Sequence, residues 1–418
     1  MVRIHHFQSR LGTLSTICLV VLLLAACSPT RKRHFDPSKV AFTATSNPLL
    51  DTQIYPSLLL ALGQSETSPR TSNLAPFTLS LTAPSNNAVL RVVIDSSALN
   101  YVTILQEILP MRGETYTFTP AVKWKYERLR HIRTPQRIDL TLTCYINDEE
   151  VDVKNLHLTA RPTTECPLSF SHNGKVVDTR WLFAAYVNED HPYIDQILTD
   201  ILTQGTVSRF TGYQTGRTTD VDQQVFAVWH YALSQGLTYS SITCTSNPSP
   251  HANVQHIRLF DQVYNSRQAN CVDACVFFAS ILRKIGLQPI IFVEPCHAYL
   301  GYYTDRKKKN IHLIETTITS WVNYPQIIKN MGEGGRITDS DLNNLAKYIS
   351  PEQLESYQQG NMSTDQLLLA VSHSLFDKAQ QYNVETFTEN RQHFADSAAI
   401  TFQQLDIEQL RTLVQPIN

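Results

Sequence analysis

The stretch "RQANCVDACVFFASILRKIGLQPIIFVEPCHAYL", residues 267–300, decides the fold and the function expected of this 418-residue chain. From Cys271 to Gly286 it contains no proline and no other glycine, and Asn270 precedes it. Its apolar residues recur at helical spacing and share one face. They are Val272, Cys275, Val276, Ala279, Leu282 and Ile285. The pattern predicts a helix that begins at Cys271 or one residue after it.

A cysteine at a helix N-terminus is well placed for nucleophilic chemistry. The first N–H groups of a helix have no intrahelical acceptor and the helix dipole is positive there, so both favour a thiolate. The same N–H groups can also face a developing oxyanion. Taken alone, Cys271 is better explained as a buried cysteine at the start of a helix. A partner is therefore needed before Cys271 is interpreted as a nucleophile.

His297 is the candidate partner. The segments "HAYLGYY" (297–303) and "IHLIETT" (311–317) are typical of strands and flank the basic segment "TDRKKKN", which predicts a hairpin. If its tip lies near residue 306, His297 and Glu315 are equally distant from it (306 − 297 = 9 and 315 − 306 = 9). Residues equidistant from a hairpin tip face each other. The Glu315 carboxylate would then orient the imidazole and stabilise its cation.

Together these residues resemble the transglutaminase-like cysteine protease superfamily. Its members combine a cysteine at a helix start, a histidine at a strand start and an acid on the next strand. The Asn-Cys-Val-Asp core, the Pro-x-His-Ala element and the Glu-Thr-Thr ending are similar to a bacterial branch, over roughly residues 220–325. The resemblance implies a transglutaminase-like, papain-like α+β domain. It also implies that Cys271 is the nucleophile, His297 the general base and Glu315 the orienting acid.

Three positions depart from the family pattern. Ala269 stands two residues before Cys271, where the family commonly has glycine. Cys296 replaces the glycine that usually precedes the histidine, and Glu315 replaces the usual aspartate. Cys296 in particular places a second thiol beside the expected base.

Other polar residues near the predicted site have weaker or different expected roles. The resemblance suggests a further oxyanion donor upstream of Cys271, at Gln255 or Gln262. Asp273 is expected to serve the first turn of the helix electrostatically. The C-x₃-C…C-H spacing is poor for zinc, because C-x₂-C or C-x₄-C pairs are usual. We therefore expect no metal site and no cofactor at Cys271, Cys275, Cys296 and His297.

The N-terminus has the pattern of a targeting signal. Arg3 and Arg10 precede an apolar stretch, residues 17–26, whose length of ten residues (26 − 17 + 1) is too short to span a bilayer. It ends in Leu-Ala-Ala-Cys, which resembles a bacterial lipobox. The resemblance implies that Cys27 is lipidated and holds the mature chain on a membrane. Ser28, rather than aspartate, follows and favours the outer membrane; an ordinary secretory signal that contains a cysteine is the alternative.

Composition divides the remaining chain into segments. A region rich in Ser, Thr, Pro and Asn predicts a tether, with ordered structure expected from around residues 49–63. Short alternating strands follow and predict an antiparallel β-sandwich of Ig-like size; later segments have helical spacing. The expected class is α+β. The predicted parts are a signal peptide (1–26), a tether (27–70), the sandwich (71–170), the transglutaminase-like domain (171–330) and a helical C-terminal extension packed on that domain (331–418).

Bulk properties narrow the expected partners. The formal net charge of -2 gives no general attraction to nucleic acid. An envelope compartment is oxidising enough for disulfides, and Cys144 and Cys166 are candidates for one. The sequence does not specify the oligomeric state. The remaining partners are the membrane, through Cys27, and a peptide, protein or cell-wall substrate.

Two functions fit these observations. The first is an envelope lipoprotein acting as a cysteine peptidase or amidase through an acyl-thioester at Cys271. Hydrolysis is favoured over amine transfer because no residue marks an amine site. The second is a non-catalytic lipoprotein that binds a peptide or glycan and reuses the fold. A Cys271 blocked by a disulfide to Cys296 would favour the second.

Overall fold

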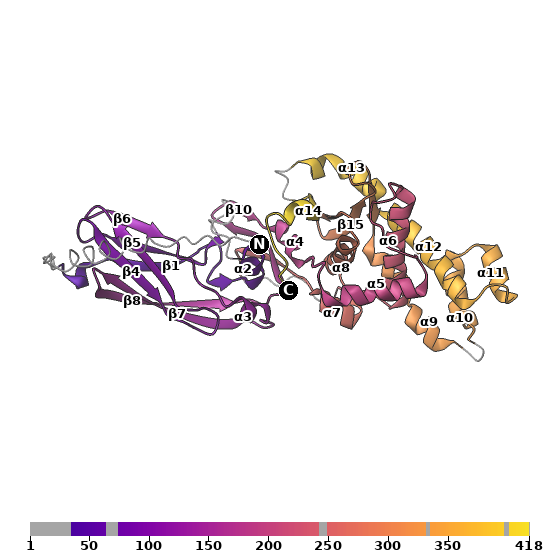
Figure 1. Cartoon of the computed structure of the whole chain (residues 1–418), viewed down its shortest axis with the longest axis horizontal. Coiled ribbons are helices and arrows are strands. Elements are labelled where there is room, and N and C mark those ends of the chain that lie inside the picture. Colours follow the sequence, from indigo (N-terminus) through magenta and orange to yellow (C-terminus); the bar gives the residue numbers. More distant parts are fainter. Residues whose placement is uncertain (1–34, 64–73, 242–248, 332–334, 397–400, 418) are drawn as a thin grey trace, which may run out of the picture.

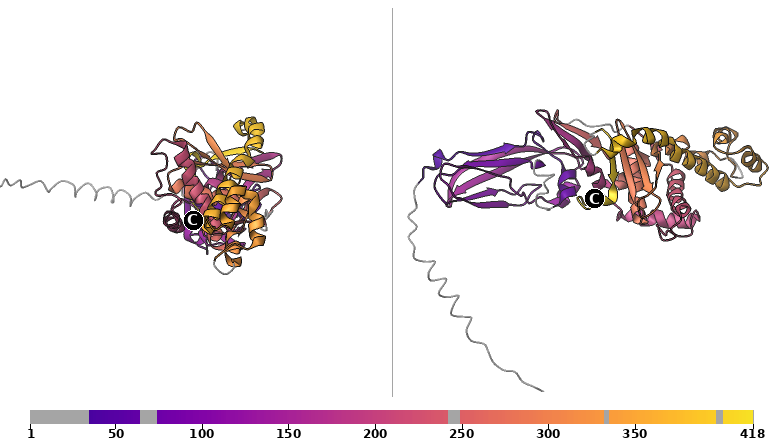
Figure 2. Two further views of the ribbon diagram at one scale, coloured as in Figure 1. Left: turned by 90° about the vertical axis from the view of Figure 1, so that its right-hand side faces the viewer. Right: turned by 90° about the horizontal axis from the view of Figure 1, so that it is seen from above.

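The computed structural model of this chain describes residues 35–63, 74–241, 249–331, 335–396 and 401–417. The molecule is elongated, with the strands of the first half at one end and a mixed region of helices and strands at the other (Figure 1). The view from above in Figure 2 shows the same division. Separate sheets and helices make this an α+β protein, as predicted. In the described part of the chain, every helix is too short or too polar to cross a membrane.

Two sheets build the first half of the molecule. Their strands alternate buried with more exposed residues, so each sheet turns one face toward the core. On β4, for example, Ala88, Leu90, Val92 and Ile94 are buried and the residues between them are not. One sheet has the order β1-β3-β6 and the other β2-β8-β7-β4-β5. The bounds are β1 (Phe42–Ser46), β3 (Phe77–Thr82), β6 (Thr115–Phe118), β2 (Gln53–Ile54), β8 (Glu149–Ala160), β7 (Gln136–Ile146), β4 (Ala88–Ile94) and β5 (Thr103–Leu109).

The boundaries of this half differ from those expected from composition. Strand β1 lies in the predicted tether, ahead of the residues expected to be ordered, yet it pairs with β3. Strand β2, which pairs with β8, and helix α2 (Pro56–Leu62) lie within residues 49–63, where ordered structure was expected. The predicted boundary at residue 170 lies inside β9 (Glu165–His172). Composition does not locate the start of the first half or its predicted end at residue 170, because both depend on strand pairing with distant segments.

A third sheet joins the two halves. Strand β9 pairs with β10 (Lys175–Asp178) and with β12 (Ala252–His256), which comes from the second half of the chain. Cys144 lies on β7 and Cys166 on β9, in different sheets, and both are buried free thiols. The candidate disulfide between them is therefore not formed.

The second half is built on a four-stranded antiparallel sheet of order β16-β15-β14-β17. Helix α8 (Cys271–Lys284) packs against β14 (Pro289–Glu294) and β15 (His297–Tyr303). On the opposite face, Phe292 and Tyr299 pack against Phe394 of α13 (Val384–Ala395). The sheet is thus covered on both faces. Its remaining strands are β16 (Ile311–Ile314) and β17 (Gln403–Asp406).

The C-terminal region is mostly helical, as expected, but it is more than an extension. Helix α12 (Thr364–Tyr382) packs against β16 and against α6 (Thr218–Ser234), and β17 pairs with β14 to complete the sheet. The tail then returns to the junction, where the N–H of Ile417 donates to the carbonyl of Ala185 at 3.0 Å and the N–H of Gln415 donates to the carbonyl of Ala61 in the first half at 2.9 Å. The last segment therefore helps to hold the two halves together.

The remaining elements belong to both halves, and α3 packs against α2 in the first half (Figure 1). The short strands β11 (Thr238–Tyr239) and β13 (Gln268–Ala269) form a parallel pair directly before α8. Further helices are α3 (Tyr126–Arg130), α4 (Phe183–Tyr186), α5 (Pro192–Gln204), α7 (Phe260–Ser266), α9 (Tyr324–Asn330), α10 (Asp339–Leu345), α11 (Pro351–Gln358) and α14 (Ile407–Leu410).

Candidate functional site

Cys271 is the first residue of α8, as the sequence predicts. A reciprocal capping box fixes this helix start. The Asn270 side chain accepts from the N–H of Asp273 at 2.8 Å, and the Asp273 carboxylate accepts from the N–H of Asn270 at 3.0 Å. Because the box occupies the N–H of Asp273, the earlier N–H groups of Cys271 and Val272 are the ones without an intrahelical acceptor. The half-buried Cys271 side chain therefore lies at the positive end of the helix.

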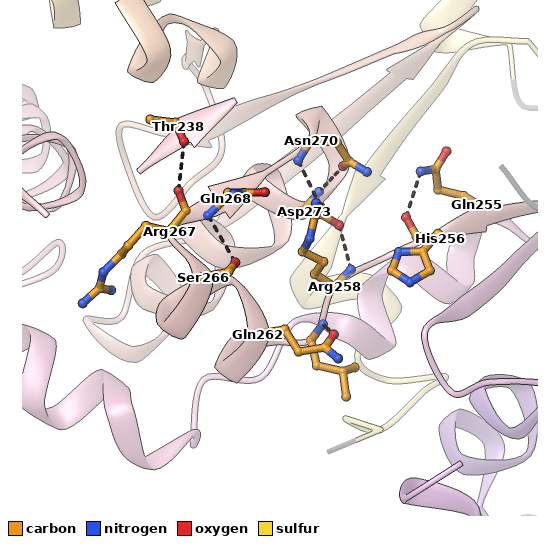
Figure 3. A network of polar contacts seen from close by, with 11 residues as sticks. Thr238, Gln255, His256, Arg258, Gln262, Ser266, Arg267, Gln268, Asn270 and Asp273 are labelled. Atoms are coloured by element: carbon orange, nitrogen blue, oxygen red, sulfur yellow. Dashed lines mark hydrogen bonds and ion pairs between the residues drawn. The ribbon is translucent and has the colours of Figure 1, made fainter. Parts of the chain in front are cut away.

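Asp273 is the centre of a buried polar network (Figure 3). Its side chain is fully buried and accepts from the Arg258 guanidinium at 2.6 Å and from the Arg258 N–H at 2.7 Å. Burial raises the pKa of Asp273, although the N–H donors of Asn270 and Arg258 act in the opposite direction. Asp273 thus anchors the helix start and takes no direct part in the site, in agreement with its expected role.

His297 lies at the first position of β15, directly after a two-residue turn from β14. Its Nε2 is 2.8 Å from Glu315 Oε2, and Cys271 lies near enough to the imidazole to raise its pKa. The three residues that the sequence singles out are therefore brought together. Since the side chain of His297 is 29% exposed and that of Glu315 is fully buried, the site is reached from the imidazole side.

The hairpin places Glu315 differently from the sequence prediction. Leu300 pairs with Ile314 and Tyr303 with Ile311, so continuing this register puts Glu315 opposite residue 299 instead of His297. The prediction was therefore wrong by two residues, because the turn is centred one residue later than assumed. An even shift keeps side chains on the same face of a sheet. Glu315 lies just past the end of β16 and reaches His297 diagonally.

The Glu315 carboxylate is hydrogen bonded on both oxygens. Oε1 accepts from the N–H of Thr317 at 2.9 Å and from its hydroxyl at 2.7 Å. Oε2 accepts from Asn383 Nδ2 at 2.7 Å in addition to its contact with His297. Asn383 is buried between α12 and α13 and caps neither helix with its side chain. It is a site residue that the sequence analysis missed.

The electrostatics of the site favour a charged His297–Glu315 pair. Interactions with Cys271 and then with Glu315 raise the pKa of His297 to about 10, against the opposing effect of burial. Burial acts to raise the pKa of Glu315, but the hydrogen bonds from His297, Thr317 and Asn383 outweigh it and hold that pKa below its ordinary value. At neutral pH the imidazole is therefore protonated and lies between a sulfur and a carboxylate.

The two glutamines suggested as oxyanion donors have other contacts. The amide of Gln255 donates to the carbonyl of His256 at 2.9 Å, and the Gln262 side-chain oxygen accepts from the N–H of Leu259 at 2.9 Å (Figure 3). The second contact belongs to the capping box of α7. Neither contact directs a side chain toward Cys271. The free N–H groups at the start of α8 are the better candidates for an oxyanion site.

Ala269 and Cys296, which stand where the resembled superfamily commonly has glycine, are accommodated in different ways. Ala269 is buried in β13, where its carbonyl accepts from the N–H of Ser240, and its φ lies outside the left-handed region. Cys296 is exposed in the turn before His297 with φ of 64°, in the left-handed region that favours glycine. Ala269 therefore costs little, whereas Cys296 occupies a strained position.

The other predicted features are less directly involved. Cys275 is fully buried on α8, as expected for a core residue. Cys271 and Cys296 are both free thiols. Among the described residues, no group of three or more His, Cys, Asp or Glu side chains is arranged to hold a metal ion. Cys27, the predicted lipidation site, and Cys244 lie outside the described residues.

Comparison with known proteins adds no further assignment. No protein-family profile matches this chain, and the search of curated protein sequences finds no significant match. The functional interpretation therefore depends on the geometry around Cys271, His297 and Glu315.

Proposed function

We propose that this protein is a cysteine hydrolase, a peptidase or amidase that acts through an acyl-thioester on Cys271. One observation carries the proposal: the His297 imidazole is hydrogen bonded to the buried carboxylate of Glu315 and lies close enough to Cys271 for that residue to raise its pKa. A nucleophile, a base and an orienting acid in this order form the arrangement used for covalent acyl transfer.

The proposed reaction starts from the thiolate–imidazolium pair. Cys271 Sγ attacks the carbonyl carbon of an amide, and the developing oxyanion is stabilised by the N–H groups at the start of α8. The imidazolium of His297 then gives its proton to the leaving amine as the C–N bond breaks. The neutral imidazole next takes a proton from water, which attacks the thioester and releases the acid and the thiol. Glu315 keeps the ring oriented and stabilises its cationic form throughout.

The finer fold and the location belong to the same proposal. We infer that the second half is a transglutaminase-like, papain-like domain, because its helix-start cysteine, strand-start histidine and following acid occur in that order. We infer that the two sheets of the first half form an Ig-like sandwich, which is supported by their alternating burial. The lipobox-like ending at Cys27 supports a lipid anchor in the outer membrane, and a peptide, protein or cell-wall polymer as substrate.

Alkylation of Cys271 as a function of pH tests the proposal directly. Peptide mass spectrometry on reduced protein would measure the rate of reaction with iodoacetamide, for the natural chain and for His297→Ala. We expect rapid alkylation of Cys271 at pH 6 to 7 that slows at least tenfold in His297→Ala, because the imidazolium favours the thiolate. Slow alkylation that does not depend on His297 would contradict the mechanism. It would favour a binding lipoprotein instead.

Turnover is the second readout. Once a substrate is found by screening peptide and amide libraries, Cys271→Ala should abolish its hydrolysis. Cys275→Ala is the matched control, because Cys275 lies on the same helix but is buried in the core. Unchanged hydrolysis in Cys271→Ala would exclude the acyl-thioester route.

A further inference from the structure

An exposed tryptophan lies at the end of the short helix that begins at Glu315. Glu315 is the N-cap of the 3₁₀ helix η4 (Thr316–Trp321), and Trp321 is its last residue. Trp321 is 44% exposed, although tryptophan is highly buried on average. Because a 3₁₀ helix rises about 2.0 Å per residue, Trp321 lies roughly 12 Å or less from Glu315. Helix η4 also packs against α8 and β11, so one short element connects the indole to the candidate site.

Trp321 lines an open pocket between η4, α9 and α10, in the part of the second half that lies away from the sandwich (Figure 1). The volume of the pocket is about 260 Å³. Its buried lining residues are apolar: Val322, Ile327 and Leu345. Apart from the indole, its exposed or half-buried lining residues are polar. They are Asn323, Gln326, Asp341, Asn344 and Lys347.

These polar side chains keep both donors and acceptors available for a ligand. Asn323 accepts through Oδ1 from the N–H of Gln326, which leaves its amide N–H groups free of any described partner. Gln326 donates through Nε2 to Asn330, and Asp341 accepts through Oδ2 alone, so one oxygen of each remains. Neither end of the Asn344 amide is bonded to a described residue. The pocket therefore combines an accessible indole with amide and carboxylate groups that can bind a neutral polar ligand.

The charge and the shape of the pocket argue against several other ligands. Asp341 and Lys347 contribute one charge of each sign, so net charge attracts neither an anion nor a cation. None of the described lining residues belongs to a strand, so a peptide finds no strand edge to extend. Trp321 is the single aromatic residue of the described lining, whereas proline-rich segments dock in grooves lined by several rings. The volume lies below the range typical of drug-sized ligands and suits one small ring.

We propose that this pocket binds one neutral sugar ring of a glycan that also carries the amide cleaved at Cys271. The face of a pyranose ring that exposes C–H groups is apolar and can stack on an indole, whereas its hydroxyl groups both donate and accept hydrogen bonds. The pocket divides its contacts in the same way between Trp321 and the polar side chains. The sugar site stands without the proposed function. The link from the bound glycan to Cys271 rests on that function.

Calorimetric titration with chitotetraose and with cellotetraose tests the sugar site in the full chain. We expect saturable binding that Trp321→Ala weakens about tenfold or more, because an aromatic anchor carries much of the affinity of a small site. Trp321 is also the most exposed of the four tryptophans, so the ligand should shift the fluorescence emission of the natural chain. Tighter binding of chitotetraose would identify acetamido sugars as the ligand, and equal binding would show that hydroxyl groups suffice.

Asn344 and Asn343 provide a matched pair of variants. Both are exposed residues of α10, but only Asn344 lines the pocket, so neither change should affect folding. Asn344→Ala should weaken binding about threefold, because one neutral hydrogen bond is lost, and Asn343→Ala should not. No saturable binding of either saccharide, or an equal loss in the two variants, would overturn the sugar site. Binding of uncharged peptides without saccharides would overturn it as well.

A glycan with a tethered electrophile tests the link to Cys271. The probe is chitotetraose joined at its reducing end to a bromoacetamide, through an ethylene glycol linker long enough to reach from the pocket to the thiol. Cys271 Sγ attacks the methylene carbon, a thioether forms and bromide leaves. Peptide mass spectrometry measures this reaction separately from that of the exposed Cys296 thiol. Because binding raises the effective concentration of the electrophile, Cys271 should react about tenfold faster with the probe than with free bromoacetamide.

The ratio of these two rates separates the sugar site from the proposed function. Trp321→Ala should bring the ratio close to one, and Asn343→Ala should preserve it. If free bromoacetamide reacts slowly with Cys271 and independently of His297, the proposed function and the link fail, while calorimetry still decides the sugar site. If Cys271 is reactive but neither saccharide binds, the sugar site alone fails. If saccharides bind but the probe has no advantage, the link between the pocket and Cys271 is overturned.

Discussion

The two ends of the candidate site are built in different ways. The thiol end is local, because Asn270, Cys271 and Asp273 are neighbours in sequence and one capping box sets their geometry. The acid end is assembled from distant segments, since Glu315 follows β16 whereas Asn383 comes from the α12–α13 junction, 68 residues later. The comparison teaches that the nucleophile depends on the stability of one helix start, whereas the base depends on how the C-terminal region packs.

At the thiol end, the largest effect on stability is expected from the buried Arg258–Asp273 ion pair. Replacing Arg258 with Met leaves the Asp273 carboxylate buried without its cation. Breaking a buried pair in this way costs about 3–5 kcal/mol of unfolding free energy. Urea denaturation would measure the loss. The deficit should shrink as the pH is lowered, because the isolated carboxylate then takes up a proton.

The chain offers a matched control for this prediction. Arg217 and Asp220 also form an Arg–Asp pair, but the Arg217 side chain is 72% exposed. Arg217→Met should leave stability unchanged within the error of the measurement, because exposed ion pairs contribute little. Equal losses in the two variants would mean that Arg258 does not support the helix start specifically.

At the acid end, Asn383 is expected to act as a positioning residue. Asn383→Leu removes one donor to Glu315 Oε2 and should cost about 1–3 kcal/mol, because a buried charged group loses a hydrogen bond. The pKa of Glu315 should then rise. The pH below which alkylation of Cys271 slows should rise with it. Asn383→Gln keeps an amide and should restore part of the natural profile. Asn361→Leu, at an exposed asparagine, is the control.

A purely structural role for Asn383 predicts a different result. Asn383→Leu would then lower stability and leave the pH dependence of alkylation where it is in the natural chain. The two outcomes decide whether the C-terminal region supports the chemistry or only the fold.

The coupling between the two ends is visible in the titration of His297. Its pKa is raised to about 10, first by Cys271 and second by Glu315. Cys271→Ala should therefore lower this pKa, which should remain above the ordinary value of 6.5 because Glu315 is still present. Long-range ¹H–¹⁵N NMR of the imidazole nitrogens would measure the change. An identical titration in Cys271→Ala would contradict the Cys271–His297 contact.

The same shifts define a pH window for stability. Because the folded pKa of His297 is raised, its contribution is fully present below pH 6.5 and is lost as the pH rises through about 10. The folded pKa of Glu315 is lowered, so its contribution is present above pH 4.5 and is lost as the pH falls. The pair should therefore stabilise the fold most between these two ordinary values. In Cys271→Ala the loss on the alkaline side should begin at the same pH but end at lower pH, and its total should be smaller.

Sequence reasoning succeeded where the determinants are local. The uninterrupted run after Cys271 predicted the start of α8 to within one residue, and the strand pattern of residues 297–303 predicted β15. Glu315 was identified through an incorrect register, and the side-chain alternation of strands preserved the correct face. The spacing Asn270-x-x-Asp273 is typical of a capping box, so the sequence could also have predicted that Asp273 fixes the start of α8.

What escaped prediction is non-local. Asn383 has no motif of its own, and its role follows only from the packing of α12 against β16. Likewise, β17 pairs with β14 more than one hundred residues earlier, and β12 joins β9 across the predicted domain boundary. These contacts depend on the tertiary arrangement of segments, which periodicity and composition do not encode.

The smallest expected effect concerns the turn that presents His297. Cys296 holds a φ of 64°, which a residue with a Cβ adopts at a cost of roughly 1–2 kcal/mol. Cys296→Gly removes that cost but adds freedom to the unfolded chain, so we expect a net gain of at most about 1 kcal/mol. Thermal unfolding would measure it, with Cys296→Ala as the control that keeps the Cβ. Because Pro295 and the β14–β15 pairing still fix the hairpin, alkylation of Cys271 should be unchanged in both variants. Slower alkylation in Cys296→Gly would mean instead that Cys296 rigidifies the turn and helps to position His297, and would make this substitution part of the site.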